Sequence, residues 1–169
     1  ELVGEITNGS HFKINQTGTN LKFIPGTITN NHGEYFNFKV HESRALSYYL
    51  EGIFMISIYG KEKLNCGLNG VTNNHTDMSV DCFKAGIESI IGKLVVGDEG
   101  SKFEIIARSF YPNNTTGFVK FIFPIIRFIE PFDFTNIGKI KKVRGHCFTN
   151  NCSTFSHKII DTLRVNFNK

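Results

Sequence analysis

The polar segment from Thr72 to Ser79 has residue types suited to binding chemistry. Its candidate binding residues are Thr72, Asn73, Asn74, Asp77 and Ser79. The segment lies between an expected strand end and an expected helix start, where backbone N–H groups point outward and can bind an anion. The alternative is a helix start capped by Asp77 or Ser79, and both interpretations can hold together.

A second candidate is the basic cluster formed by Lys139, Lys141, Lys142 and Arg144, with Arg127 nearby in the sequence. On a strand, this cluster would show positive charge on both faces. Such a surface can contact the phosphates of RNA or an acidic partner. The alternative is a solvated edge strand whose lysines protect it against aggregation.

Arg108 and Pro112 lie at the loop of an expected hairpin and are the remaining candidates for RNA or partner binding. The alternative is that this loop only connects the two strands of the hairpin. A separate set of residues invites a zinc interpretation, namely His146, Cys147, Cys152 and His157. Their spacing departs from the usual finger patterns, and the ligands would straddle a strand and a helix. We therefore expect no metal site here and favour ordinary strand and helix-cap roles.

The elements that position these residues follow from hydrophobic periodicity. Strand patterns occur at residues 11–15, 20–24, 34–40, 63–71, 102–110, 117–126 and 140–148, and helix patterns at 43–59, from 79 onward and at 155–165. Over residues 34–126 the order is strand, helix, strand, helix, strand, strand. Two crossovers and a hairpin predict an α+β fold with a mixed four-stranded sheet and two helices on one face.

The composition, 40% hydrophobic and 20% charged over 169 residues, predicts a packed core. The formal net charge of +4 permits RNA binding without indicating it. The four cysteines do not form a disulfide framework, so we expect reduced thiols. No apolar run reaches the roughly 18 residues of a membrane span, so no membrane is expected as a partner. The start at Glu1, without methionine or leader, suggests a fragment of a longer protein.

Three segments together resemble the RNA 3'-terminal phosphate cyclase family, and most closely its cyclase-like branch. They are Gly70 to Asn74 with Asp77 to Asp81, Arg108 to Pro112, and Gly138 to Gly145. The resemblance implies the βαβαββ repeat also seen in the C-terminal domain of bacterial translation initiation factor three. It further implies a tail of a preceding repeat at 1–25, a complete repeat at 26–128, and the start of the next repeat and a small insert domain at 129–169.

The motifs that catalytic cyclases carry are altered in this chain. Their hairpin loop is similar to R-G-x-x-P-x-G-G-G, whereas here Ser109 replaces the first glycine and residues 114–116 replace the last three. The loop that follows Val71 lacks the acidic residue and proline of the family's G-G-T-D-N-P-S. None of the six histidines sits in the motif of the family's histidine nucleophile. The resemblance therefore implies no catalytic residue and no cofactor, with ATP and Mg²⁺ needed only by a true cyclase.

By resemblance, the expected role is non-catalytic, in small ribosomal subunit biogenesis and pre-18S ribosomal RNA processing. The implied partners are a ribosome-assembly GTPase and pre-ribosomal RNA, and the implied location is the nucleus and nucleolus. One alternative is a true RNA 3'-terminal phosphate cyclase, which forms a 2',3'-cyclic phosphate with ATP. The other is a generic RNA-binding module, although we expect the sheet to lack an aromatic pair for base stacking.

Overall fold

The computed structural model describes residues 1–94, 101–111, 116–129, 131, 133, 135, 138–149 and 152–167. The chain divides into two compact units, Glu1–Phe132 and Asp133–Lys169. Two predicted features lie outside the described residues: the site residue Pro112 and the loop residues 114 and 115.

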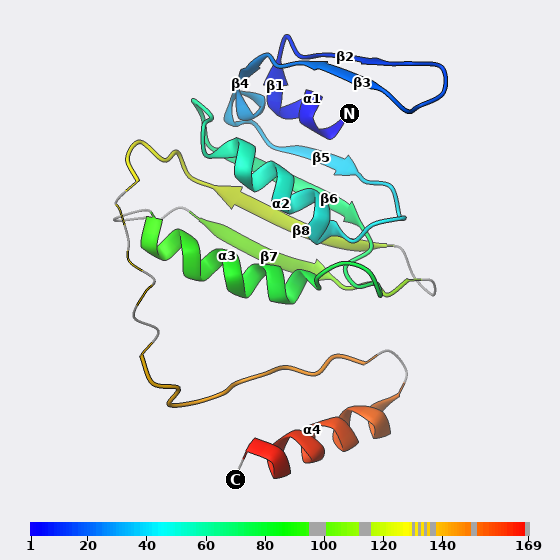
Figure 1. Cartoon of the computed structure of the whole chain (residues 1–169), viewed down its shortest axis with the longest axis vertical. Coiled ribbons are helices and arrows are strands. Elements are labelled where there is room, and N and C mark those ends of the chain that lie inside the picture. The colour runs from blue at the N-terminus through cyan, green and yellow to red at the C-terminus, as the bar shows by residue number, and fades with distance from the viewer. Residues whose placement is uncertain are drawn as a thin grey trace. The chain divides into compact units, whose positions relative to one another are not determined.

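The centre of the first unit is a mixed four-stranded sheet in the order β5-β6-β8-β7 (Figure 1). Its strands are β5 (Phe36–Lys39), β6 (Leu64–Gly70), β7 (Lys102–Ala107) and β8 (Gly117–Phe123). β5 is parallel to β6, and β8 is antiparallel to both β6 and β7. Helices α2 (Leu46–Ser57) and α3 (Val80–Leu94) lie on one face of this sheet. The α+β fold and the predicted order of strands and helices are thus confirmed.

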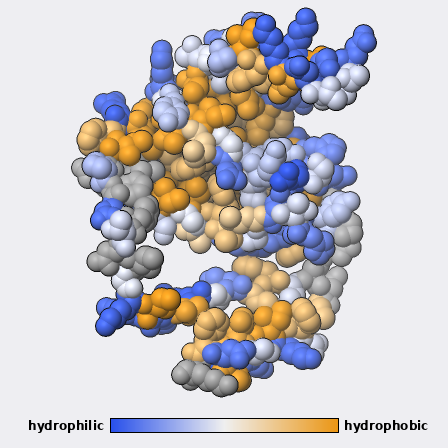
Figure 2. All heavy atoms as spheres, in the orientation of Figure 1, coloured by the Kyte–Doolittle hydropathy of each residue, from blue (hydrophilic) through white to orange (hydrophobic). Residues whose placement is uncertain are grey.

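The core lies between this sheet and the two helices because apolar residues alternate along the strands and recur every three or four residues along the helices. The strands contribute Leu64, Cys66, Leu68, Phe103, Val119, Phe121 and Phe123, and the helices contribute Leu46, Leu50, Ile53, Phe54, Val80, Phe83, Ile87 and Ile91. Aromatic rings join the layers: the ring centroids of Phe54 and Phe123 are 5.0 Å apart. On the helix-bearing face, apolar side chains remain visible among polar ones (Figure 2).

The N-terminal part of the first unit consists of short elements. Two of them confirm the predicted strands, since β2 (His11–Ile14) pairs with β3 (Leu21–Ile24) in an antiparallel hairpin. The sequence patterns missed α1 (Leu2–Ile6), the pair of β1 (Thr7–Asn8) with β4 (Thr27–Ile28), and the 3-10 turn η1 (Asn30–Gly33). Elements of two to five residues are too short to display a periodicity.

In the second unit, helix α4 (Ser153–Phe167) confirms the helix predicted at 155–165. The strand predicted from Ile140 to Phe148 is wrong, because residues 138–149 have no regular secondary structure. A strand needs a neighbour for its backbone N–H and C=O groups and a cover for its apolar side chains. The described residues of this unit supply neither, and Ile140 remains 86% exposed. Among the described residues, no helix has the length and apolarity needed to cross a membrane.

Candidate functional site

The predicted binding loop lies where three elements meet. β6 ends at Gly70, and the next residue, Val71, forms a parallel bridge with Ala45 just before α2. Two residues further on, Asn73 forms a parallel bridge with Phe110, beyond the end of β7. The backbone of the loop is therefore held on both sides before the chain enters α3.

Asp77 fastens this loop to the start of α2. Its carboxylate accepts hydrogen bonds from the Arg44 guanidinium at 2.8 Å and from the Ala45 backbone N–H at 2.7 Å. The Asn74 side-chain amide donates a further bond at 2.9 Å. The Asp77 side chain is only 5% exposed, and the bond from Arg44 is the main reason that its pKa lies well below the usual range. The carboxylate is thus committed to contacts within the protein.

The loop's other polar groups also bond within it. The Asn74 carbonyl oxygen Oδ1 accepts from the backbone N–H groups of Thr76 at 3.0 Å and Asp77 at 2.7 Å. Ser79 Oγ accepts from the N–H of Cys82 at 3.2 Å, so Ser79 caps α3 as the capping interpretation predicts. The Val80 N–H donates to the Thr72 carbonyl at 3.2 Å. Several amides that could have received an anion are therefore already engaged.

Thr72 and Ser109 connect the loop to the end of β7 through a reciprocal pair of hydrogen bonds. The Thr72 N–H donates to Ser109 Oγ at 3.1 Å, and the Ser109 N–H donates to Thr72 Oγ1 at 2.9 Å. Ser109 Oγ in turn donates to the Gly70 carbonyl at 3.0 Å. Both residues are buried. Gly117 permits this approach, because a Cβ there would come within 2.6 Å of both the Gly70 oxygen and Ser109 Oγ.

The role of Ser109 does not follow from the sequence patterns, in which this residue is only a departure from the family's glycine. The available signal is a small hydroxyl residue in place of a glycine. Asn73 belongs to the same junction, since its N–H donates to the Ser109 carbonyl and its carbonyl accepts from the Tyr111 N–H, each at 3.1 Å. The structure therefore brings the two predicted loops together by bonds between their own residues.

Arg108, predicted to bind RNA or a partner, pairs with Asp81 in the first turn of α3. The Nη2 to Oδ1 distance is 2.7 Å, and Nε donates to Oδ2 at 3.2 Å. The hydrogen bond that Arg108 donates to Asp81 raises the pKa of Arg108. About a third of the Arg108 side chain remains exposed. In this structure the Arg108–Asp81 ion pair connects the end of β7 to the first turn of α3.

The basic residues Lys139, Lys141, Lys142 and Arg144 lie in the second unit, on its irregular segment, and all four are exposed. The same segment holds His146, whose ring stacks on Phe148 with centroids 6.2 Å apart. Among the described residues, no group of three or more His, Cys, Asp or Glu side chains could hold a metal ion.

Burial raises the pKa of the Cys66 thiol, in the core of the first unit, to about 12.

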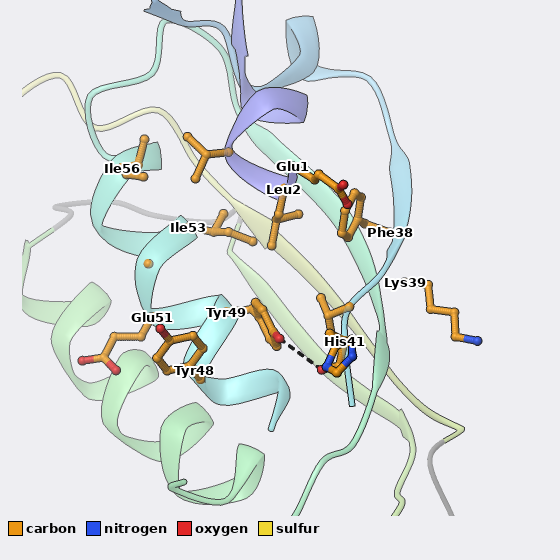
Figure 3. Close-up of a pocket in the computed structure, with 13 residues that line it drawn as sticks. Glu1, Leu2, Phe38, Lys39, His41, Tyr48, Tyr49, Glu51, Ile53 and Ile56 are labelled. Atoms are coloured by element: carbon orange, nitrogen blue, oxygen red, sulfur yellow. Dashed lines mark hydrogen bonds between the residues drawn. The ribbon is translucent and has the colours of Figure 1, made fainter. Parts of the chain in front are cut away.

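A pocket of about 610 Å³ lies between α1, β5 and α2 (Figure 3). Its lining is mainly apolar, with Leu2, Phe38 and Ile53 among the contributors. The Tyr49 hydroxyl donates to the His41 carbonyl at 3.0 Å across it. None of the predicted site residues lines this pocket.

A second pocket, of about 580 Å³, lies between α2 and α3, and the Arg44–Asp77 pair forms part of its wall. Met55 and Met78 line it and are both more than half exposed.

Chemically, the loop from Thr72 to Ser79 is a structural junction, because the buried Asp77 carboxylate and the Thr72 and Ser79 hydroxyl groups bond to the protein itself.

Comparison with known proteins identifies similar sequences over nearly the whole chain. The profile of the family described as RNA 3'-terminal phosphate cyclase matches residues 1–158. The RNA 3'-terminal phosphate cyclase-like protein of Homo sapiens is 33% identical over 169 residues, covering 99% of this chain and 44% of the human protein. The probable RNA 3'-terminal phosphate cyclase-like protein of Arabidopsis thaliana is 35% identical over 168 residues, covering 99% of this chain and 44% of the Arabidopsis protein.

The rRNA processing protein rcl1 of Schizosaccharomyces pombe is 27% identical over 169 residues, covering 96% of this chain and 44% of the yeast protein. The chain therefore spans less than half the length of these curated relatives.

Proposed function

This chain belongs to the RNA 3'-terminal phosphate cyclase family, and from that premise we propose that it serves ribosome biogenesis without catalysing RNA end cyclisation. The proposed role is in small-subunit assembly and the processing of pre-18S ribosomal RNA. One similar protein is named an rRNA processing protein, and others are named cyclase-like, which supports this choice.

The observation that carries the proposal is the position of Ser109. By the family resemblance, catalytic cyclases carry a glycine at the corresponding position, where a bare backbone can approach a phosphate closely. Here the Ser109 side chain fills that place, and it is bonded to the Thr72 N–H and the Gly70 carbonyl. A phosphate at this place would have to displace a buried hydroxyl and leave two backbone groups without their present partner.

The proposal extends to partners and location. We infer that the whole protein works with pre-ribosomal RNA and a ribosome-assembly GTPase in the nucleolus, and that it needs neither ATP nor Mg²⁺. The division into a repeat tail at 1–25, a complete repeat at 26–128 and a further repeat with a small insert domain from 129 belongs to the same proposal.

The first test is incubation of the whole protein with labelled ATP and an RNA that ends in a 3'-phosphate. A known active cyclase serves as the positive control. We expect no covalent label on the protein and no cyclised RNA end. A covalent adenylate together with a 2',3'-cyclic phosphate would overturn the proposal in favour of the cyclase alternative.

The second test addresses the positive half of the proposal. Depletion of the protein in its own cells should make uncleaved precursors of 18S ribosomal RNA accumulate, as measured by hybridisation with probes for the spacer sequences. Unchanged precursor levels after complete depletion would contradict a role in this pathway.

A further inference from the structure

The four-stranded sheet has one face that α2 and α3 leave uncovered, here called the open face. Because side chains alternate along a strand, it carries the residues between the core positions. They are Asn37 and Lys39 on β5, Asn65, Gly67 and Asn69 on β6, Phe118, Lys120 and Ile122 on β8, and Lys102, Glu104 and Ile106 on β7. Tyr35, immediately before β5, lies on the same face.

Two aromatic side chains meet at the centre of the open face. A Cβ at Gly67 would come within 2.3 Å of the Tyr35 hydroxyl and 2.8 Å of the Phe118 ring, so both side chains lie directly over Gly67. The strand order explains the meeting, since β6 lies between β5 and β8. Tyr35 is 46% exposed. Tyr35 and Phe118 are distant along the chain, so no local sequence pattern connects them.

The open face is also positively charged. Lys39, Lys102 and Lys120 lie on its strands, against the single carboxylate of Glu104. The Lys120 ammonium group lies over the Tyr35 ring, 5.5 Å from its centroid. A cation beside an exposed ring is the combination that single-stranded nucleic acid uses, because its bases stack on rings and its phosphates pair with lysines.

From this arrangement we propose that the open face binds single-stranded RNA. Tyr35 and Phe118 provide the stacking surface for bases, and Lys39, Lys102 and Lys120 contact the phosphates. On the same face the side-chain amide of Asn69 donates a hydrogen bond at 2.5 Å to the side-chain oxygen of Asn37, and the amide groups left over from this bond can read base edges. The choice of RNA as ligand rests on the proposed function, whereas the choice of surface rests on the side chains of the sheet.

The test measures binding of the whole protein to a fluorescein-labelled oligouridine and to an RNA duplex of equal length. Tyr35→Ala should weaken oligouridine binding by about 5- to 150-fold, the usual range for loss of one stacked base. Tyr35→Phe keeps the ring and should bind nearly as well as the unaltered protein. The duplex should bind more weakly, because its bases are not free to stack.

The lysines are tested by the salt dependence of the same binding. The double variant Lys39→Gln with Lys120→Gln should reduce the slope of log affinity against log salt by about 0.7 per lost phosphate contact. The matched control is Lys84→Gln with Lys93→Gln, because both of these lysines lie on α3, on the helix-covered side of the sheet. The control should leave the slope unchanged.

A measurement on the unaltered protein keeps the proposal testable even if a variant fails to fold. Crosslinking to 4-thiouridine RNA should label peptides that contain Tyr35 or Phe118. The proposal is overturned if the protein binds no single-stranded RNA, if crosslinks map only to the helices, or if the open-face variants bind like the controls. None of these results affects the adenylation test, and a covalent adenylate would overturn the proposed function without altering where RNA crosslinks.

Discussion

The loop from Thr72 to Ser79 and the open face of the sheet both carry polar side chains, but they use them in opposite ways. In the loop, Asn74 and Asp77 accept hydrogen bonds from groups of the protein itself. On the open face, Tyr35 and Lys39 stay exposed to solvent. A buried polar group has to find its partner inside the fold, whereas an exposed group remains available to a ligand. Polar composition alone therefore does not distinguish a junction from a binding surface.

The largest expected effect is a difference in the free energy of unfolding between substitutions on the two faces of β8. Phe121→Ala removes a ring that is 1% exposed and should lower the free energy of unfolding by about 3–5 kcal/mol. Phe118→Ala, on the open face of the same strand, should cost only about 1 kcal/mol. Urea unfolding followed by far-ultraviolet circular dichroism measures both. Equal losses would show that something covers the open face as completely as the helices cover the core.

The next effect concerns the loop as a junction. Asp77→Ala should lower the free energy of unfolding by about 3 kcal/mol, because it removes a charged acceptor that three donors share. RNA binding by the open face should stay unchanged, since Asp77 lies beyond the end of the sheet. If the variant were as stable as the original chain but lost a ligand, the loop would be a binding site. The proposed difference between the loop and the open face would then be wrong.

A smaller effect tests the position at which the family has a glycine. Ser109→Gly leaves the buried Thr72 N–H and Gly70 carbonyl without their partner and should cost about 1–2 kcal/mol. Ser79→Gly is the matched comparison, because glycine tolerates the N-cap position and the cost should be only a few tenths of a kcal/mol. The same urea titration compares the two variants. A harmless Ser109→Gly change would mean that the two loops are held together by other contacts.

The smallest effect is the response to mild acid. The folded-state pKa of Asp77 lies below the value of about 3.9 for an unfolded chain, so its ionised form stabilises the fold above about pH 5. That contribution should diminish as the pH falls from about 5 towards the folded-state pKa. The stability difference between the original chain and Asp77→Asn should therefore shrink in this range. A difference that stays constant would show that the Asp77 carboxylate does not titrate as the Arg44 bond requires.

The elements with long, regular patterns could be predicted from the sequence. The stripes Leu46–Leu50–Ile53 and Phe83–Ile87–Ile91 predicted α2 and α3, and the same residues are buried in the core. The strand predicted from Ile140 to Phe148 is wrong, because alternating apolar and polar side chains do not by themselves supply a neighbouring strand for the backbone hydrogen bonds. Ser79 as the cap of α3 was among the predicted possibilities, since a cap depends only on residues next to it in the chain.

The sequence by itself determined the α+β order of elements, the two apolar helix stripes and the family, because each depends on residues that are close in the chain or on motifs read directly. Only the tertiary structure decided what the candidate residues contact. Thr72 reaches Ser109, Arg44 reaches Asp77, and Tyr35 meets Phe118 over Gly67. These pairs depend on the strand order β5-β6-β8-β7 and on its register, which bring together residues that no local pattern connects.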